Sequence, residues 1–583
     1  MKNYEKTQQT QIYVILVIMN VIIITMSTAL YAHDCQKTYF VDPVNGNDSW
    51  NGRQKLFTES DNGPWKTIMQ SNDSLKDGDC VYLLGGEYPE SISPINSGTS
   101  ETRPIIYSAE PGERVVITKK AILNGKKFII IDNLQFQSSD STSWVTTDKY
   151  TEHIQLINNS FDAAIQFKDF GGIALYGHHY VLRNNVFGRW VGDMIYIIEA
   201  SHILIENNDF SQAAAGHAVI QILGKNVIIR NNYFRNPWSR VLSITWNGTI
   251  ATEKVLVENN LFIDSDWNLT DPHPRQGGSG EVVLLNGNKI IFRNNLVIGS
   301  NRGKEVPWTG ILSFTAFDSR SPYYYGYLAN HFENIRVYHN TIYQNTNNAM
   351  VFTSQSQNYR LYAKNNIFVN NVIYQADGYI LNIVVPYIPL ETYVFESNIM
   401  GGQSKPNPLY LTTTNESQQV IAGEATLERA ESLFPQVFTN NITQPPVFKD
   451  QTILMHAESS PQTFALKDLS KFFASFSLIE SSPGSNAGKH LTTVRRSRTQ
   501  TQQLQVEDTL YFSDGMDLIE GDNVLIGDNK VVKIKKILDG KTLLVDSSIS
   551  VQQGDKVYLE KTGRNPSIGI YNNNFNGIAE GEN

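Results

Sequence analysis

Four side chains of complementary chemistry open successive strand-like runs in the middle of the chain. Asp193, His217 and Arg240 each lie 9 or 10 residues after a recurring asparagine-aromatic phrase, and Glu281 lies 22 residues after the next one. An acid, an imidazole, a guanidinium and a second acid in one row could shift one another's pKa values and act as acid and base catalysts. The same row could be a ladder of surface ion pairs with little energetic effect. Both interpretations stay open.

The alternation of side chains along the strands leaves the direction of one member of this row open. Successive side chains point to opposite faces of a strand, so a slip of one residue exchanges the faces. Ala218 and Ile220 can point inward without disturbing the row, whereas Leu242 and Ile244 pointing inward would turn Arg240 inward as well. The face of Arg240 is therefore the weakest part of this pattern.

A long insertion, residues 264–280, leaves and re-enters the repeat pattern beside this row. Long loops on a rigid scaffold are where binding and catalysis concentrate. The insertion contains carboxylates, a base, a guanidinium and a ring that could stack on a sugar: Asp264, Asp266, Trp267, Asp271, His273 and Arg275. We predict His273 and Arg275 as further catalytic residues, and Asp264, Asp266 and Asp271 as ligands of Ca²⁺, which prefers oxygen ligands.

Two more loops, residues 301–308 and 319–332, add aromatic side chains to the same region. Aromatic rings suit the apolar faces of pyranose sugars, although clustered tyrosines can also simply pack a loop. The predicted substrate-binding residues are Trp267, Trp308, Tyr323, Tyr324, Tyr325 and the cation Lys289.

Two reactions on a polysaccharide fit these residue types. A uronan lyase must neutralise the C6 carboxylate and remove the C5 proton; the cations and bases for this are Arg240, Arg275, Lys289, His217 and His273. A glycosidase needs an acid and a base or nucleophile, for which the sequence offers Asp193 with Glu281, or Asp264 with Asp271. The separation of two carboxylates cannot be read from a sequence, so both reactions stay open.

The elements that would position these residues follow from a repeat. The phrases NNSF, NNVF, NNDF, NNYF and NNLF begin at Asn158, Asn184, Asn207, Asn231 and Asn259, at steps of 26, 23, 24 and 28 residues. Such a period predicts a solenoid, in which each repeat buries its apolar face only against its neighbours. Further copies begin at Asp132, Asn294, His339, Asn365 and Ser397.

The repeat unit has the residue types of β-strands. A β-branched run with period-two alternation precedes each phrase and another follows it, which leaves room for two or three short strands per coil and none for a crossover helix. Strands that recur once per coil stack in parallel about 4.8 Å apart. Asparagine suits the tight turn because it tolerates the left-handed conformation, and stacked asparagines can satisfy one another's amides.

The N-terminal segments YFVDPVNGNDSWNG, GPWKTI, LKDGDCVYLLGGEY and RPIIYSAEPGERVVI, within residues 39–117, resemble the start of secreted right-handed parallel β-helix proteins, including polysaccharide lyases of the pectate-lyase-like superfamily. With the coils, the resemblance covers residues 37–489. It implies a right-handed parallel β-helix and a polysaccharide partner. The scaffold carries lyases, hydrolases, epimerases and binding proteins. DPH at Asp271 is similar to a segment of mannuronan epimerases, but Pro274 stands where those enzymes have an acid.

Composition and the chain ends set further bounds. With 583 residues, 41% hydrophobic content and a net charge of −9, the chain is globular and a poor partner for nucleic acids. Residues 1–32 resemble a secretory signal cleaved near Ala29 or Ala32, the alternative being an uncleaved anchor. Cys35 and Cys80 could form one disulfide in an oxidising compartment, or Cys80 could be a small core residue.

We therefore predict an exported monomer, secreted, periplasmic or on the cell surface, with lyase-like action on a uronic-acid-containing glycan. The alternative is a non-catalytic glycan-binding, adhesion or structural protein. The predicted segments are a signal peptide (1–32), an N-terminal cap with the first coils (33–125), the β-helix core (126–406), irregular closing coils and linker (407–490), a small β-barrel or sandwich (491–563) and a C-terminal tail (564–583).

Overall fold

The structure is a computed structural model of the 583-residue chain. It describes residues 34–138, 143–163, 171–190, 192–210, 214–215, 218–235, 240–245, 252–263, 282–298, 310–316, 331–345, 348–354, 362–376, 378–384, 390–402, 406–414, 420–453 and 466–571. The predicted signal segment lies outside these residues. In the described segments, no helix is long and apolar enough to cross a membrane.

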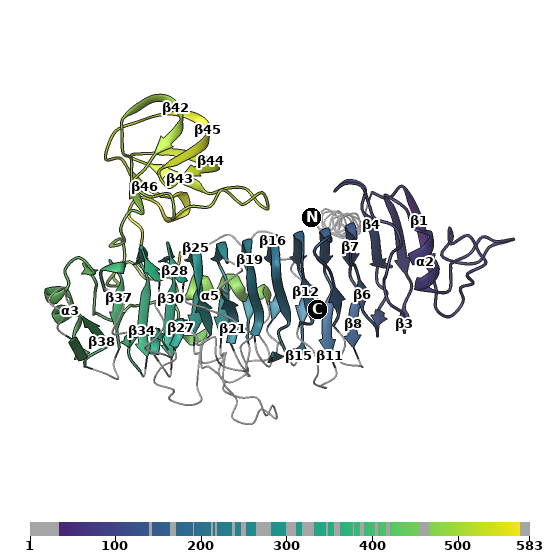
Figure 1. Ribbon diagram of the computed structural model, residues 1–583, viewed down its shortest axis with the longest axis horizontal. Coiled ribbons are helices and arrows are strands. Elements are labelled where there is room, and N and C mark those ends of the chain that lie inside the picture. Colours follow the sequence, from purple (N-terminus) through teal and green to yellow (C-terminus); the bar gives the residue numbers. More distant parts are fainter. Residues whose placement is uncertain are drawn as a thin grey trace, which may run out of the picture.

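The described strands form a parallel β-helix whose coils stack along the long axis of the molecule (Figure 1). Each regular coil contributes three strands, so the stacked coils form three rows of strands. The row whose strands precede the asparagine turns is called here the first row, and the second and third rows follow it in chain order. The first and third rows join into one 26-stranded sheet, and the second row is a separate 12-stranded sheet.

The first row precedes the asparagine turns. It contains β1 (Lys37–Val41), β2 (Asp79–Leu83), β4 (Ile105–Ala109), β7 (Lys127–Asp132), β10 (Glu152–Ile157), β13 (His178–Arg183), the C-terminal parts of β16 (Ile195–Glu206) and β19 (Ala218–Arg230), β22 (Glu253–Glu258), β25 (Gly287–Arg293), β28 (His331–Glu333), β29 (Arg336–Tyr338), β32 (Tyr362–Lys364), β33 (Asn366–Val369), β36 (Tyr393–Glu396) and β40 (Phe438–Thr439).

The second row follows the turns. It contains β3 (Gly86–Tyr88), β5 (Val115–Ile117), β8 (Gln135–Ser138), β11 (Ser160–Ala163), β14 (Val186–Phe187), β17 (Asp209–Phe210), β20 (Tyr233–Phe234), β23 (Leu261–Ile263), β26 (Leu296–Ile298), β30 (Thr341–Asn345), β34 (Val372–Ala376) and β37 (Ile399–Gly401).

The third row completes each coil. It contains β6 (Ala121–Ile122), β9 (Val145–Thr146), β12 (Ile173–Leu175), the N-terminal parts of β16 and β19, β21 (Arg240–Ile244), β24 (Val283–Leu285), β27 (Gly310–Ala316), β31 (Asn348–Ser354), β35 (Leu381–Val384) and β38 (Leu409–Thr414), which ends in an antiparallel hairpin with β39 (Val420–Ala425). The short strands β15 (Arg189–Trp190) and β18 (Ala214–Ala215) pair separately.

The asparagine turns work as the sequence predicts. The first residue of the phrases adopts a left-handed conformation, with φ near +55°, as at Asn158, Asn184 and Asn207, and His339 and Ser397 do so where they replace asparagine. In the copy predicted to begin at Asp132, the left-handed residue is Asn133 instead. The second asparagine is buried and accepts a hydrogen bond on Oδ1 from the backbone N–H of its counterpart one coil earlier. This ladder runs through Asn159, Asn185, Asn208, Asn232, Asn260, Asn295, Asn340, Asn371, Asn398 and Asn441.

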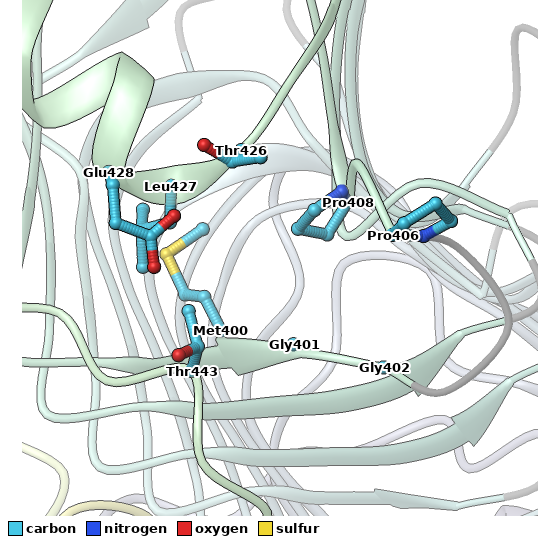
Figure 2. A pocket seen from close by; sticks show the side chains of 9 residues that line it. All are labelled: Met400, Gly401, Gly402, Pro406, Pro408, Thr426, Leu427, Glu428 and Thr443. Atoms are coloured by element: carbon cyan, nitrogen blue, oxygen red, sulfur yellow. The ribbon is translucent and has the colours of Figure 1, made fainter.

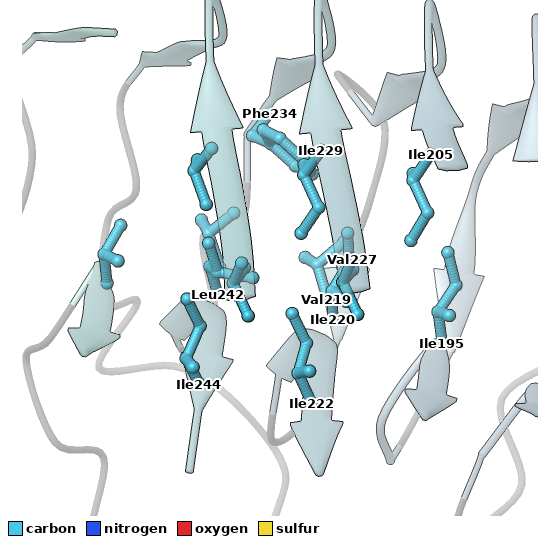
Figure 3. Packing of buried hydrophobic residues seen from close by; sticks show 14 of the residues in the cluster. Ile195, Ile205, Val219, Ile220, Ile222, Val227, Ile229, Phe234, Leu242 and Ile244 are labelled. Carbon is cyan, nitrogen blue, oxygen red and sulfur yellow. The ribbon is translucent and has the colours of Figure 1, made fainter. Parts of the chain in front are cut away.

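The aromatic residue of each phrase points into the solenoid. Phe136, Phe161, Phe187, Phe210, Phe234 and Phe262 form one continuous stack with ring centroids 4.5–5.1 Å apart. Aliphatic side chains of the other rows fill the rest of the interior, and Figure 3 shows Ile195, Ile220 and Leu242 recurring at equivalent positions in successive coils. The inward-facing positions therefore recur at the same place in every coil. Because side chains alternate along a strand, this also determines which positions face outward.

A small antiparallel domain follows the solenoid and packs on the first row. Its six strands are β41 (Thr492–Thr493), β42 (Arg498–Gln505), β43 (Asn523–Ile526), β44 (Lys530–Asp539), β45 (Thr542–Val551) and β46 (Lys556–Leu559), followed by η4 (Glu560–Thr562). It appears in yellow-green above the solenoid in Figure 1. Leu204, Ile228, Leu256 and Ile291, on the outward face of the first row, share one buried cluster with its core.

The second row is covered by segments that the sequence pattern does not reveal. The helix α5 (Leu469–Ser475), preceded by η3 (Leu466–Asp468), packs Phe472 and Phe473 against outward side chains of this row. The segment after the small domain returns to the solenoid, where Gly569 donates its N–H to the Asn370 carbonyl and Tyr571 donates to Asn294 Oδ1. The region predicted as irregular closing coils, residues 407–490, thus contains α3 (Leu427–Leu433) and α5, while η1 (Leu390–Thr392) lies in the last part of the segment predicted as β-helix core.

The N-terminal end is closed by the short helix α2 (Ile68–Ser74), whose Thr67 side chain caps the helix by accepting the N–H of Gln70. Cys35 and Cys80 form a disulfide there. It connects the chain just before β1 to the paired strand β2, and Cys80 is at the same time a buried core residue beside Ile106 and Ile130.

Candidate functional site

The outward face of the third row carries polar side chains in register. Tyr196 pairs with Gln221 and Gln221 with Ser243, and further along the row the same column alternates apolar and polar residues: Leu284, Ser313, Val351 and Asn382. All but Tyr196 are buried, with exposed fractions of 7% or less. Outward faces of the other two rows pack apolar side chains against the small domain and α5, although the first row also has ion-paired outward residues such as Glu206 and Arg230. In the coils of β16, β19 and β21, the outward face of the third row is therefore polar, and it is called here the polar face.

Two of the predicted catalytic residues lie at the beginning of third-row strands. Asp193 lies two residues before β16 and is 3% exposed, and Arg240 opens β21 and is 6% exposed. The Arg240 guanidinium donates from Nη1 to Ser243 Oγ at 3.3 Å. Because Ser243 is on the outward face while Leu242 and Ile244 fill the core, Arg240 reaches the polar face despite the alternation problem.

The strand register relates this pair to the rest of the predicted row. Ile195 pairs with Ile220, and Ala218 pairs with Arg240, so Asp193, Ala218 and Arg240 share one register position. His217 is one residue removed from that position. His217 and Glu281 themselves lie outside the described residues.

Lys289 is placed away from Asp193 and Arg240. It is exposed, has a φ of +57° and is the third residue of β25, in the first row. Lys289 is thus in a different row from Arg240, and its predicted contact with the same substrate stays a prediction. A regular strand pattern cannot tell the end of one row from the beginning of the next.

The loop residues predicted from the sequence lie outside the described segments, so their predicted roles stay predictions. They are Asp264, Asp266, Trp267, Asp271, His273, Arg275, Trp308, Tyr323, Tyr324 and Tyr325.

A row of histidines that was not predicted from the sequence lies where the third-row part of each coil passes into the first-row part. His153, His179 and His202 occupy equivalent positions near the beginning of β10, β13 and within β16, each with a φ between +56° and +62°. Their rings are stacked with centroids 4.5 Å and 4.7 Å apart, and Phe128 stacks on His153 at 4.4 Å. The signal was present, because the three histidines recur at steps of 26 and 23 residues, in phase with the asparagines.

The histidine row is electrostatically unusual. Partial burial and the neighbouring His153, His202 and His178 lower the pKa of His179 to about 4. Burial also lowers the pKa of His202, although Asp517 of the small domain opposes this. The pKa of His179 means that its ring is neutral at pH 7 and can act as a lone-pair donor.

A separate pocket of about 250 Å³ lies near the C-terminal end of the solenoid, where α3 meets β37 (Figure 2). Its lining residues are Met400, Gly401, Gly402, Pro406, Pro408, Thr426, Leu427, Glu428 and Thr443. Glu428 is the one ionisable side chain in this lining. A single carboxylate among backbone and apolar groups gives no acid and base pair, so we do not assign the polysaccharide site here.

Comparison with known proteins agrees with the coil geometry. Residues 171–383 match the family model described as a right handed beta helix region. No curated protein matches the sequence. The three rows and this match define the chain as a right-handed parallel β-helix protein, which confirms the fold class predicted from the repeats. The small C-terminal β domain is an antiparallel sheet, as the sequence predicts.

Several solved structures are similar at low sequence identity. A mannuronic-acid-specific polysaccharide family 6 lyase from human gut microbiota is 11% identical, with a TM-score of 0.42 over 73% of this chain and 94% of that one. A PL6 family alginate lyase is 15% identical, with a TM-score of 0.39 over 68% of this chain, which spans 62% of its length. A GH87 α-1,3-glucanase from Streptomyces thermodiastaticus is 11% identical, with a TM-score of 0.41 over 64% of this chain and 65% of that one.

Proposed function

We propose that this protein acts on a polysaccharide along the outward face of the third row, as a lyase of uronic-acid-containing glycans outside the cytoplasm. The observation that carries the proposal is that two buried charged residues, Asp193 and Arg240, share one register position of the third row, two coils apart. The outward faces of the first and second rows are packed under other elements in these coils.

Arg240 fits the electrostatic part of a β-elimination. A guanidinium is planar and binds a carboxylate through two parallel hydrogen bonds, so Arg240 can neutralise the C6 carboxylate of a uronate and acidify its C5 proton. A base then removes this proton, a C4–C5 double bond forms, and the C4–O bond breaks with the electron pair passing to the departing oxygen. His217 and His273 are the proposed bases.

Gln221 and Ser243 can orient the sugar beside Arg240. They are adjacent in register and supply an amide and a hydroxyl to the same face. Gln221 donates from Nε2 to Thr245 Oγ1 at 2.6 Å, and its buried Oε1 has no hydrogen-bond partner among the described residues. A buried acceptor without a donor costs free energy, and a sugar hydroxyl would supply that donor.

Two further parts of the proposal concern the ion and the compartment. The carboxylates Asp264, Asp266 and Asp271 are proposed ligands of Ca²⁺, which a chelator would remove with a loss of activity. Export is supported by the Cys35–Cys80 disulfide, because disulfides persist in oxidising compartments. Secretion, the periplasm and the cell surface are all consistent with it.

The test measures two products on the same samples. The purified protein would be incubated with alginate, pectate, chondroitin and neutral glycans, with and without Ca²⁺, while ultraviolet absorbance of unsaturated ends and total reducing ends are followed. We expect both to rise with a uronan. Arg240→Gln should lower kcat/KM by about 100-fold or more, as expected for loss of a charge contact made in the transition state, whereas Arg495→Gln, which changes an exposed arginine of the small domain, should not.

The other outcomes separate the alternatives. Reducing ends without unsaturated ends would replace the lyase with a hydrolase that uses carboxylates such as Asp193. Glycan binding without either product would favour the non-catalytic binding protein. Activity that is unchanged in both Arg240→Gln and Asp193→Asn would show that the third row is not the site.

A further inference from the structure

We propose that His153, His178 and His179 form a binding site for a divalent first-row transition metal ion, for which Zn²⁺ is the test ion. One ring nitrogen from each histidine lies within 4.8 Å of the other two. This site is separate from the proposed polysaccharide face. Within β16, the histidine row passes through His202, in the first-row part of the strand, whereas Asp193 precedes the third-row part.

The separations of the ring nitrogens are close to those of a metal site. Two nitrogens bound tetrahedrally to Zn²⁺ at 2.0–2.1 Å lie about 3.3 Å apart. His178 Nδ1 and His179 Nδ1 are 2.7 Å apart and share a hydrogen bond. A small rotation of one ring would open this pair to the metal-bound separation, with the ion replacing the shared proton.

Carboxylates hold the outer nitrogens of two of these rings. His153 Nδ1 is 2.5 Å from Glu101 Oε1, and His178 Nε2 is 2.9 Å from Glu152 Oε2. A histidine that donates one N–H to a carboxylate keeps a lone pair on the other nitrogen, and metal-binding histidines are usually oriented in this way. These two carboxylates supply the negative charge beside the ion, partly offset by Lys127, which pairs with Glu152.

The fold also holds the rings in place. Glu152 and His178 are directly paired in the register of β10 and β13, which fixes the carboxylate beside its imidazole. His153 is packed between Phe128 and His179, and His179 between His153 and His202. Because an imidazole binds a metal in the plane of its ring, His153 or His179 turns out of this nearly parallel stack when both bind one ion. The side chains remain partly exposed, at 22% for His153 and 42% for His178, so an ion can enter.

The ligand set selects the class of ion. Imidazole nitrogens suit Zn²⁺, Cu²⁺ and Ni²⁺, whereas Ca²⁺ and Mg²⁺ prefer oxygen ligands. Three protein nitrogens leave a fourth position for water, as in sites that keep an open coordination position. The proposed Ca²⁺ site on Asp264, Asp266 and Asp271 would therefore be distinct in its chemistry.

The test is a calorimetric titration of the full-length, tag-free protein with Zn²⁺ after dialysis against a chelator. We expect one strong Zn²⁺ site per chain and a rise in Tm on binding, and the same site should take up Co²⁺ with a visible absorption band typical of nitrogen ligands. His179→Phe keeps a stacked ring and removes the ligand, and His178→Gln removes a second one. Each should abolish the strong site, while Glu152→Gln should weaken it about 10–100-fold.

Two matched variants make the result specific. His202→Phe changes a histidine of the same stack outside the cluster, and His490→Gln changes a histidine of the linker to the small domain. Both should bind Zn²⁺ as the unchanged protein does. The proposal is overturned if the unchanged protein takes up no stoichiometric Zn²⁺ or Co²⁺, or if folded His178→Gln and His179→Phe bind as tightly as before. Circular dichroism checks that the variants are folded. Zn²⁺ uptake by the unchanged protein tests the proposal even if a variant does not fold.

Discussion

The asparagine turns show how a single residue type can have two structural roles in one repeat. The first asparagine supplies a left-handed turn and is partly exposed in some coils, as at Asn158 and Asn184, whereas the second is buried and bonded to the coils on both sides. The spacing predicted both roles, because only a residue with a coil-by-coil partner can be polar and buried. The direction of Arg240 could not be predicted in the same way, since its strand begins irregularly and its guanidinium turns back to Ser243.

Removing one ladder residue should therefore be much more harmful than changing a turn residue. Asn232 is fully buried; its Oδ1 accepts from the Asn208 N–H, and its Nδ2 donates to the Ile205 carbonyl. Asn232→Ala leaves these groups without partners, and we expect a loss of about 3 kcal/mol in the free energy of unfolding. Asn184→Gly, which keeps the left-handed turn, should cost about 1 kcal/mol or less. Urea denaturation measures both. An equal loss of unfolding free energy in the two variants would contradict the idea that the buried asparagine ladder stabilises the solenoid.

At the scale of elements, the strands of the solenoid were predictable from the sequence, whereas the segments that pack on their outward faces were not. Strand chemistry repeats in every coil, so the three rows follow from local pattern and period. The helix α5 has seven residues, too few to be stable alone. It exists because Phe472 and Phe473 bury themselves on the second row, a contact between segments far apart in the chain. The histidine row was predictable in principle, because its period matches that of the asparagines.

The disulfide belongs to this scale because it fastens the first coil to the second. Cys35 and Cys80 are 45 residues apart and flank the paired strands β1 and β2. A link that closes a loop of this length stabilises the folded chain by about 4 kcal/mol in the chain-entropy model. We expect the Cys35→Ala/Cys80→Ala double variant to lose protection of β1 and β2 in hydrogen exchange. The central coils around β19 serve as the internal control and should keep their protection. Unchanged exchange at β1 would contradict this role.

At the scale of the whole molecule, a chain of charges connects the solenoid to the small domain. Arg183, Glu206, Arg230, Glu258 and Arg293 alternate in sign along the first row, and Arg293 also forms two hydrogen bonds with Asp522, at 2.6 and 2.7 Å. Arg336 forms a second bridge to Asp508. The partners are 172 and 229 residues apart in the chain, so no local pattern could pair them. Domain docking was therefore beyond prediction from the sequence.

This charge network predicts how acid affects the docking of the small domain. Burial alone would raise the pKa of Glu258, but the ion pair with Arg293 outweighs it and holds the pKa below its ordinary value. A carboxyl with a lowered folded-state pKa contributes stability above its unfolded pKa, about 4.3. That contribution is lost as the pH falls through the folded-state value. We therefore expect Tm to fall more steeply below about pH 4.3 in the unchanged protein than in Glu258→Gln.

Thermal unfolding from pH 7 to pH 3, followed by circular dichroism, measures this difference. At pH 7, Glu258→Gln should already have a lower Tm, because Arg293 is fully buried and loses one of its two carboxylate partners. Glu253→Gln is the matched control: it lies on the same strand, is partly exposed and is 4.0 Å from Lys225, so its acid profile should follow that of the unchanged protein. Parallel profiles for Glu258→Gln and the unchanged protein would mean that Glu258 does not couple docking to pH.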